Sequence, residues 1–163
     1  MGPAAFVLRG DRVLVDGALV PADVVVDAGT IEAVVPLGTA GALPVLDADG
    51  RVVLPGAVDA HVHANEPGRT SWEGFATLTA SAVAGGVTTV VDMPIDSDPP
   101  TVTVAALQAK RAALPGAAHT DVALWAGLVP SAIEHLHALL DAGAVGFKAF
   151  LCDSGWEDFP AAD

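Results

Sequence analysis

Hydrophobic and polar residues follow two different rhythms along the chain, and the rhythm changes near residue 55. Between residues 6 and 54 the sequence consists of short valine-rich segments interrupted by three turn-forming pairs, Asp16-Gly17, Ala28-Gly29 and Asp49-Gly50. Pairs of this kind supply the positive backbone angles that tight hairpin turns require. We therefore predict antiparallel hairpins that form a small β domain over residues 1–55.

The sequence after Pro55-Gly56 alternates apolar, strand-like runs with alanine-rich helical stretches. Each strand and its following helix take roughly 25 to 33 residues, which is typical of βα units and favours a parallel sheet. The expected strands cover residues 57–63, 87–93, 121–128 and 145–151, and the expected helices cover 72–84, 104–114 and 131–142. Capping-box spacings open the first helix at Thr70 and Glu73 and the third at Ser131 and Glu134. Over residues 56–163, this rhythm fits either a small open sheet or half of an eight-stranded barrel, and the rhythm alone does not decide.

Composition narrows the class of protein. The chain has 163 residues, 52% of them hydrophobic, which is enough to bury one sizeable core. Its net charge of -13 disfavours nucleic acid and anionic membrane surfaces as partners. The single cysteine permits no internal disulfide, the N-terminus lacks a secretory signal pattern, and no apolar run reaches membrane-span length. We expect a cytoplasmic protein that does not enter the membrane.

His61 and His63 lie two residues apart at the end of the first strand expected after residue 55. Because side chains alternate along a strand, both imidazoles are expected on one face, beside Asp59. Such a pair can hold one divalent ion with open coordination positions. The alternative is two histidines that are hydrogen-bonded in a loop, since two ligands alone rarely hold a metal tightly. His135 and His137 share the spacing but lie on an expected helix, and we expect them at the surface.

Lys148 interrupts the apolar run of residues 145–151, where a buried ammonium group is costly. One interpretation is a lysine whose charged end reaches water at the end of the strand. The other is that burial lowers the pKa of the amine, which then captures carbon dioxide and bridges two metal ions as a carbamate. Both interpretations predict that the side chain points inward.

The segment from Val53 to His63 resembles the Pro-Gly-x-x-Asp-x-His-x-His opening of the amidohydrolase superfamily, and the β segment before it resembles the first part of that superfamily's β-sandwich domain. Within the cyclic amidohydrolases, the chain is similar to the allantoinases. Three stretches carry this similarity: Asn65 to Thr70 with Trp72 to Phe75; Gly85 to Thr89 with Asp92 to Pro94 and Pro99 to Thr101; and Gly146 to Lys148 with Cys152, Ser154-Gly155 and Asp158 to Pro160. The resemblance implies an α/β fold, namely the first half of a (β/α)8 TIM-type barrel preceded by part of a β-sandwich.

Two positions favour allantoin over related substrates within this resemblance. Dihydroorotases usually carry an arginine where this chain has Asn65, and an amide suits a neutral ureido group better than a carboxylate. Hydantoinases usually carry a tyrosine beyond the lysine, where this chain has Asp153. Asp96 replaces an asparagine that is typical of allantoinases, so it is either a substrate-facing acid or a solvated turn residue. We take Asn65 and Asp96 as substrate-binding candidates.

The resemblance also implies a cofactor set and a mechanism. It implies two divalent ions, with zinc as the default and iron, cobalt, nickel or manganese as alternatives, held in part by His61, His63 and a Lys148 carboxylated by carbon dioxide. A bridging hydroxide would open the ring of a small cyclic ureide. The family further implies a homo-oligomer, a homotetramer in its full-length members. Because four of eight strands are expected here, we expect the 163-residue chain alone to be an inactive part of a longer enzyme.

Three alternatives stay open. The first is another cyclic amidase, such as a hydantoinase or a dihydroorotase. The second is a non-enzymatic assembly protein with the same fold, which the presence of His61, His63 and Lys148 opposes. The third is a metal-free binding module formed by the 163-residue chain itself.

Overall fold

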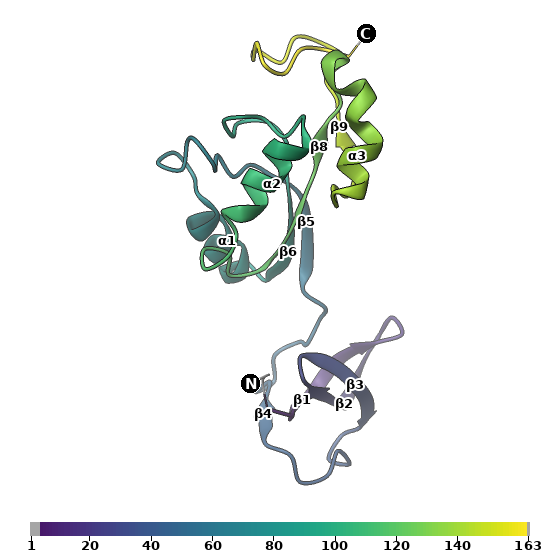
Figure 1. The fold of residues 1–163 in the computed structure, drawn as a ribbon. Coiled ribbons are helices and arrows are strands. Elements are labelled where there is room, and N and C mark those ends of the chain that lie inside the picture. Colours follow the sequence, from purple (N-terminus) through teal and green to yellow (C-terminus); the bar gives the residue numbers. More distant parts are fainter. Residues whose placement is uncertain (1–3, 163) are drawn as a thin grey trace. The chain divides into compact units, whose positions relative to one another are not determined.

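The computed structural model describes residues 4–162. The chain divides between Pro55 and Gly56 into two compact units, each with its own sheet (Figure 1). The result is a mixed α/β protein: residues 4–55 of the first unit form strands without helices, and the second unit combines strands with helices. No helix among residues 4–162 combines the length and apolar character needed to cross a membrane.

The first unit is a four-stranded sheet with the order β3-β2-β1-β4. Its strands are β1 (Phe6–Val15), β2 (Ala18–Asp27), β3 (Thr30–Pro36) and β4 (Val45–Asp47). The turns at Asp16-Gly17 and Ala28-Gly29 connect antiparallel neighbours, and all four residues have positive φ. This is the geometry of a tight hairpin turn whose twist matches its strands, so these two predicted hairpins are confirmed.

The third predicted hairpin, at Asp49-Gly50, is wrong. Strand β4 pairs with β1 in the parallel direction, and after the turn the chain makes a single parallel bridge between Val53 and Val13. The turn residues do have positive φ. The dipeptide therefore predicts the local reversal correctly, whereas the strand partner is set by burial of Val13 against Ala22 and its neighbours.

An ion pair ties the first unit together. Arg9 and Asp23 face each other across β1 and β2, with the Arg9 Nε 2.7 Å from Asp23 Oδ1. The Asp23 carboxylate also accepts hydrogen bonds from the backbone N–H groups of Gly38 and Ala40. The Arg9 hydrogen bond is the largest cause that lowers the pKa of Asp23 to about 2.

The second unit contains a parallel sheet with the order β5-β6-β7, followed by the parallel pair β8-β9. Helices precede or follow these strands, as expected for βα units. The elements are β5 (Ala57–Val62), α1 (Phe75–Ala84), β6 (Val87–Asp92), α2 (Val104–Ala112), β7 (Asp121–Leu124), β8 (Ala126–Gly127), the short 3-10 helix η1 (Pro130–His135), α3 (Leu136–Asp141) and β9 (Phe147–Lys148). Parallel strands place their carboxyl ends at one edge, so the loops after β5, β6, β8 and β9 share that edge.

Both expected capping boxes are wrong. Helix α1 begins after Gly74 without a side-chain cap, and its first N–H, that of Phe75, donates to Glu66 from the preceding loop. The Glu73 carboxylate instead accepts a hydrogen bond from Thr77. The other spacing falls in η1, which also lacks a side-chain cap. An acceptor from the preceding loop satisfies the N-terminal donor of α1, so the local motif is not needed there.

Two expected strands are shorter than predicted. The third divides at Trp125 into β7 and β8, and the fourth is reduced to Phe147–Lys148. The Trp125 indole donates from Nε1 to the Ala60 carbonyl of β5 and covers Gly146, where an added Cβ would lie 2.3 Å from a ring carbon. The backbone changes partner at this point, because the Trp125 N–H donates to Asp92 of β6 whereas the Ala126 N–H donates to Gly146 before β9.

Two apolar clusters position the second unit's elements. One contains Phe75 of α1, Leu107 of α2 and Leu139 of α3, each 0% exposed. The other lies under the carboxyl-end loops and includes Met93, Ile95, Val129, Ala132 and Phe159, with Trp125, Phe150 and Trp156 packed against them. The second cluster anchors the loops that carry the candidate site.

Candidate metal centre

His61 and His63 lie together at the carboxyl end of β5. Their ring centroids are 5.3 Å apart and their planes are tilted by 38°. The His61 residue is exposed, whereas the His63 side chain is 33% exposed. The two-residue spacing thus brings both rings to one place, as the strand periodicity predicts, and leaves them accessible to a ligand. His135 and His137 are exposed on η1 and α3, which confirms that expectation.

Asp96, from the loop after β6, contacts His63 directly. Its Oδ2 lies 2.7 Å from His63 Nδ1. Asp96 has φ 77°, in the left-handed region that aspartate tolerates better than most residues. The approach is an ion-pair contact and not an aligned hydrogen bond, because His63 Nδ1 has no hydrogen-bond partner among residues 4–162. A carboxylate at this distance, which can only accept, still favours a proton on Nδ1 and leaves the Nε2 lone pair free. A metal-binding histidine commonly has such a partner on its other nitrogen.

Lys148 ends β9 at the same edge. Its Nζ lies 4.9 Å from the Phe150 ring centroid, and the residue is half-buried, less than the apolar run suggests. The Lys148 charge acts on His63 and disfavours its protonation. The structure therefore brings His61, His63, Asp96 and Lys148 into one neighbourhood, from three separate loops and strands.

The electrostatics of His63 favour the neutral imidazole. Burial is the largest cause that lowers the pKa of His63, and Lys148 and His61 lower it further, whereas Asp96 opposes the shift. Neutral imidazole is the form that binds metal ions. His63 thus favours the protonation state that a metal ligand needs.

Asn65 occupies a more enclosed position than a substrate contact would suggest. The residue is 5% exposed, its N–H donates to the Glu73 carbonyl, and its own carbonyl accepts from the Arg69 N–H. Asn65 thereby holds the loop between β5 and α1. A contact between its side chain and a substrate stays a prediction.

Sequence reasoning missed a buried ion pair behind the site. Asp92, the last residue of β6, pairs with Lys110 of α2, and the two residues are 0% and 1% exposed. Burial raises the pKa of Asp92 to about 6, with Lys110 opposing the rise. The signal for Asp92 was an acid that ends an apolar strand. The sequence does not predict the burial of Lys110, because a lysine at this position is ordinary for the polar face of an amphipathic helix.

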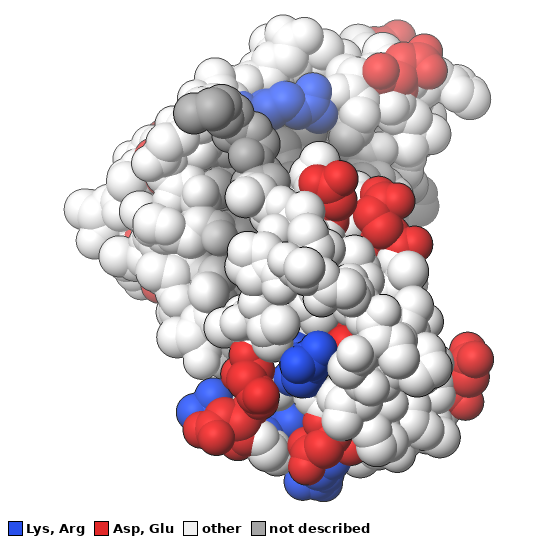
Figure 2. All heavy atoms as spheres, turned by 90° about the horizontal axis from the view of Figure 1, so that it is seen from below, with Lys and Arg blue, Asp and Glu red and all other residues white. Residues whose placement is uncertain are grey.

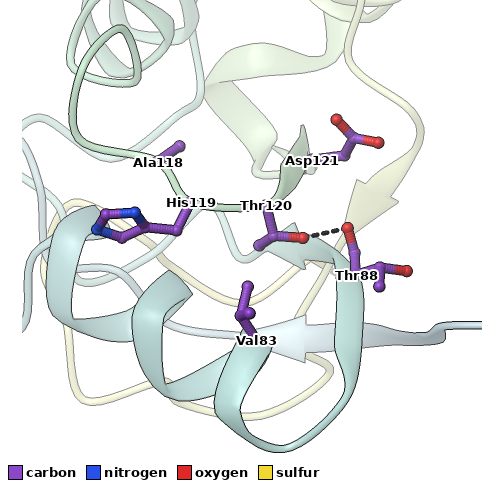
Figure 3. Close-up of a pocket in the computed structure, with 6 residues that line it drawn as sticks. All are labelled: Val83, Thr88, Ala118, His119, Thr120 and Asp121. Atoms are coloured by element: carbon purple, nitrogen blue, oxygen red, sulfur yellow. Dashed lines mark hydrogen bonds between the residues drawn. The ribbon is translucent and has the colours of Figure 1, made fainter. Parts of the chain in front are cut away.

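A second hollow lies at the opposite ends of the strands. It is lined by Val83, Thr88, Ala118, His119, Thr120 and Asp121, and Thr120 donates a hydrogen bond to the Thr88 carbonyl there (Figure 3). It is shallow and open, with one histidine and one carboxylate that do not converge on a common point in the close-up. The carboxyl edge, where four chemically active side chains meet, is the better candidate.

A compact metal cage is absent from residues 4–162, where no group of three or more histidine, cysteine, aspartate or glutamate residues could hold an ion. A metal at His61 and His63 therefore needs Lys148 or ligands from elsewhere. On the face drawn in Figure 2, acidic side chains are spread over the surface, and basic side chains lie among them at its lower end.

Comparisons with known proteins agree on one family. The model of the amidohydrolase family matches residues 52–149. An allantoinase from Streptomyces avermitilis is 49% identical over 100% of this chain, and an allantoinase from Saccharomyces cerevisiae is 56% identical over 66% of it. The chain spans 37% and 24% of the length of these two curated relatives.

Solved structures show the same fold. An L-hydantoinase (dihydropyrimidinase) from Arthrobacter aurescens matches with a TM-score of 0.87 and 31% identity, over 100% of this chain and 36% of that protein. A D-hydantoinase matches with a TM-score of 0.76 at 20% identity, over 98% of this chain and 35% of that protein, which supports the fold alone.

Proposed function

Because the chain belongs to the amidohydrolase family, we propose that it is the metal-binding first part of an allantoinase, an enzyme that hydrolyses the hydantoin ring of allantoin to give allantoate. Relatives named allantoinase match it at 42% to 49% identity over almost its whole length. The chain contributes the first half of a (β/α)8 barrel and part of a β-sandwich. A homo-oligomeric state and a cytoplasmic location remain predictions.

The observation that carries this proposal is the convergence of His61, His63 and Lys148 at the carboxyl edge of the parallel strands. The imidazole rings lie 5.3 Å apart, and the Lys148 charge acts on His63. In barrels of parallel strands this edge is where active sites are built. The charge of Lys148 disfavours protonation of His63, and the neutral imidazole is the form that binds a metal ion.

Members of the amidohydrolase superfamily generally depend on two metal ions, and the residues present fit that requirement. His61 and His63 would hold one ion through neutral imidazoles. Lys148 would hold both ions as a carbamate: its neutral amine attacks carbon dioxide, a nitrogen–carbon bond forms, and one proton is released. When bound, divalent ions such as zinc lower the pKa of water and polarise an amide carbonyl.

Asn65 and Asp96 are proposed on the substrate side. Asp96 lines a small cavity with Arg69 and Trp156, next to His63. The Arg69 guanidinium stacks 4.0 Å from the Trp156 ring centroid and forms one wall of this cavity, whose volume of about 10 Å³ holds about one water molecule. Asp96 would accept a hydrogen bond from a ureido N–H, while Asn65 would act from the loop it braces.

Hydrolysis of allantoin by the protein from the complete reading frame, expressed with divalent metal and bicarbonate, tests this proposal. Allantoate should form, and Lys148→Ala should abolish its formation. Zinc binding should weaken in His61→Ala and His63→Ala but not in the matched controls His135→Ala and His137→Ala, which change exposed histidines away from the site. An absence of metal binding in the unaltered protein would overturn the proposal.

A hydantoinase is the second candidate, because the L-hydantoinase from Arthrobacter aurescens shares 31% identity and the fold. The presence of Asn65 and Asp153 argues for allantoin instead. Parallel turnover assays with allantoin, hydantoin and dihydroorotate decide among the three. Turnover of hydantoin with none of allantoin would replace the allantoinase proposal with this one.

A further inference from the structure

Three features of the second unit lie outside the proposed metal ligands. The shallow hollow of Figure 3 contains no convergent chemistry. The Arg69–Trp156 stack belongs to the cavity already described. The buried pair Asp92–Lys110 belongs to neither. Its contacts reach the residue after His63 and the residue after Asp96, which contacts His63.

The first contact reaches the backbone that follows His63. Asp92 Oδ1 accepts a hydrogen bond of 2.6 Å from the Ala64 N–H. Ala64 is 0% exposed, so water cannot replace this bond. An unpaired buried N–H is costly, and the bond therefore fixes the direction in which the chain leaves β5.

The second contact reaches the residue after Asp96. Lys110 Nζ donates to Ser97 Oγ at 3.3 Å and to the Met93 carbonyl at 2.9 Å, in addition to its ion pair with Asp92. Ser97 is 3% exposed and its hydroxyl in turn donates to the Pro99 carbonyl. Lys110 thus holds both ends of the segment 93–97 that carries Asp96.

These two routes meet at one imidazole. The backbone route ends one residue after His63, and the loop route ends one residue after Asp96, whose carboxylate is 2.7 Å from His63 Nδ1. Asp96 has a positive φ of 77°, which aspartate tolerates, and it lies within the segment that Lys110 holds at both ends. We propose that Asp92, Lys110 and Ser97 form a buried positioning network that sets the orientation and the Nδ1–H tautomer of His63. This inference rests on the proposed function, because it assumes that His63 binds a metal.

The alternative is that the Asp92–Lys110 pair only stabilises the fold. Replacing a complete buried ion pair with neutral groups is often tolerated by the fold. The positioning role predicts something more specific. Variants that keep the fold should still misorient His63, and groups that orient a metal ligand typically change metal affinity by about 10- to 100-fold.

The test uses three variants of the full-length protein and two readouts. Asp92→Asn/Lys110→Met removes both charges but keeps an acceptor for the Ala64 N–H, whereas Asp92→Leu/Lys110→Met removes the acceptor as well. Ser97→Ala removes a single hydroxyl and guards against failure of the double variants to fold. Zinc affinity is measured by chelator competition. Nitrogen-15 NMR of the histidine rings in the metal-free protein reports the His63 tautomer.

Zinc affinity should fall about 10-fold in the first double variant and towards 100-fold in the second, with a smaller loss in Ser97→Ala. The matched control Arg9→Met/Asp23→Leu removes the ion pair of the first unit and should leave zinc affinity unchanged. In the unaltered protein the Nδ1–H tautomer of His63 should dominate, and the variants should show a mixture.

The failure of this inference differs from the failure of the proposed function. Unaltered protein that binds no zinc would overturn the metal site, while the tautomer measurement would still test the network. Zinc affinity and tautomer that match the unaltered protein in folded variants would overturn the network and leave the metal site standing.

Discussion

Replacement of Lys110 with methionine should destabilise the second unit strongly, because it leaves the Asp92 carboxylate buried without its cation. Asp92 is 0% exposed and Lys110 is 1% exposed. Methionine fills most of the space of the lysine stem, so the loss is mainly electrostatic. Removing one partner of a buried pair costs about 3 to 5 kcal/mol. A loss of that size lowers the folding equilibrium constant by more than about 100-fold.

The loss should also grow as the pH rises. Burial raises the pKa of Asp92 to about 6, so its carboxyl group favours the folded state most at low pH and loses that contribution as the pH rises through the folded value. Without Lys110, the attraction that opposes the rise is gone and the pKa of Asp92 moves higher still. The deficit of the variant relative to the unaltered protein should therefore widen between about pH 5 and pH 8.

Urea unfolding followed by tryptophan fluorescence measures this effect, because Trp72, Trp125 and Trp156 all lie in the second unit. The double variant Asp92→Asn/Lys110→Met is the control, and it should recover most of the stability because no buried charge is left unpaired. A loss below about 1 kcal/mol, within the range of ordinary substitutions, would refute the reasoning. A loss that stays constant with pH would refute the assignment of Asp92 as its cause.

Three further predictions follow from other parts of the molecule. Asp23→Asn should destabilise the first unit at neutral pH, as measured by urea unfolding followed by circular dichroism. The difference from the unaltered protein should shrink between about pH 4 and pH 2, because the lowered pKa of Asp23, about 2, confers stability that is lost as the folded carboxylate takes up its proton. Gly146→Ala should lower the thermal unfolding midpoint, since its Cβ would lie 2.3 Å from the Trp125 ring; an unchanged midpoint would contradict this close packing. Asp96→Ala should weaken zinc binding at His63 by about 10-fold in chelator competition, because it removes the side chain that contacts Nδ1; equal affinity would show that the contact does not matter for binding.

Turn chemistry was the most predictable part of the fold. The pairs Asp16-Gly17 and Ala28-Gly29 need only their own backbone angles to form a reversal, and both connect antiparallel strands. Asp49-Gly50 has the same angles but leads to a parallel bridge, because the strand partner depends on distant residues. Local chemistry therefore predicts where the chain turns, and packing decides what it then meets.

The candidate site divides in the same way. The proximity of His61 and His63 could be predicted from the sequence, because the two-residue periodicity of a strand brings both rings to one face without contributions from the rest of the chain. Asp96 was visible as a residue, but its contact with His63 depends on how the loop after β6 folds back. Lys110 was not visible, since only the tertiary structure encloses a charge that its helix would otherwise present to water.

The exposure of these groups suggests why the site is built in two layers. Apart from Asn65, which is 5% exposed, the groups proposed to bind metal and substrate are reachable: His61, His63, Asp96 and Lys148 are exposed or half-buried. Reachable side chains have rotamer freedom that must be restricted before they can bind an ion with a defined geometry. A contact at the surface is weakened by water and restricts a side chain only slightly. The Asp92–Lys110 ion pair, at 0% and 1% exposure, restricts its surroundings more strongly because each of its groups is costly to leave unpaired. The buried charges on α2 and β6 therefore belong to the same arrangement as the accessible imidazole rings after β5. The buried pair holds the backbone rigid, and this rigidity gives the imidazole rings a defined orientation for binding.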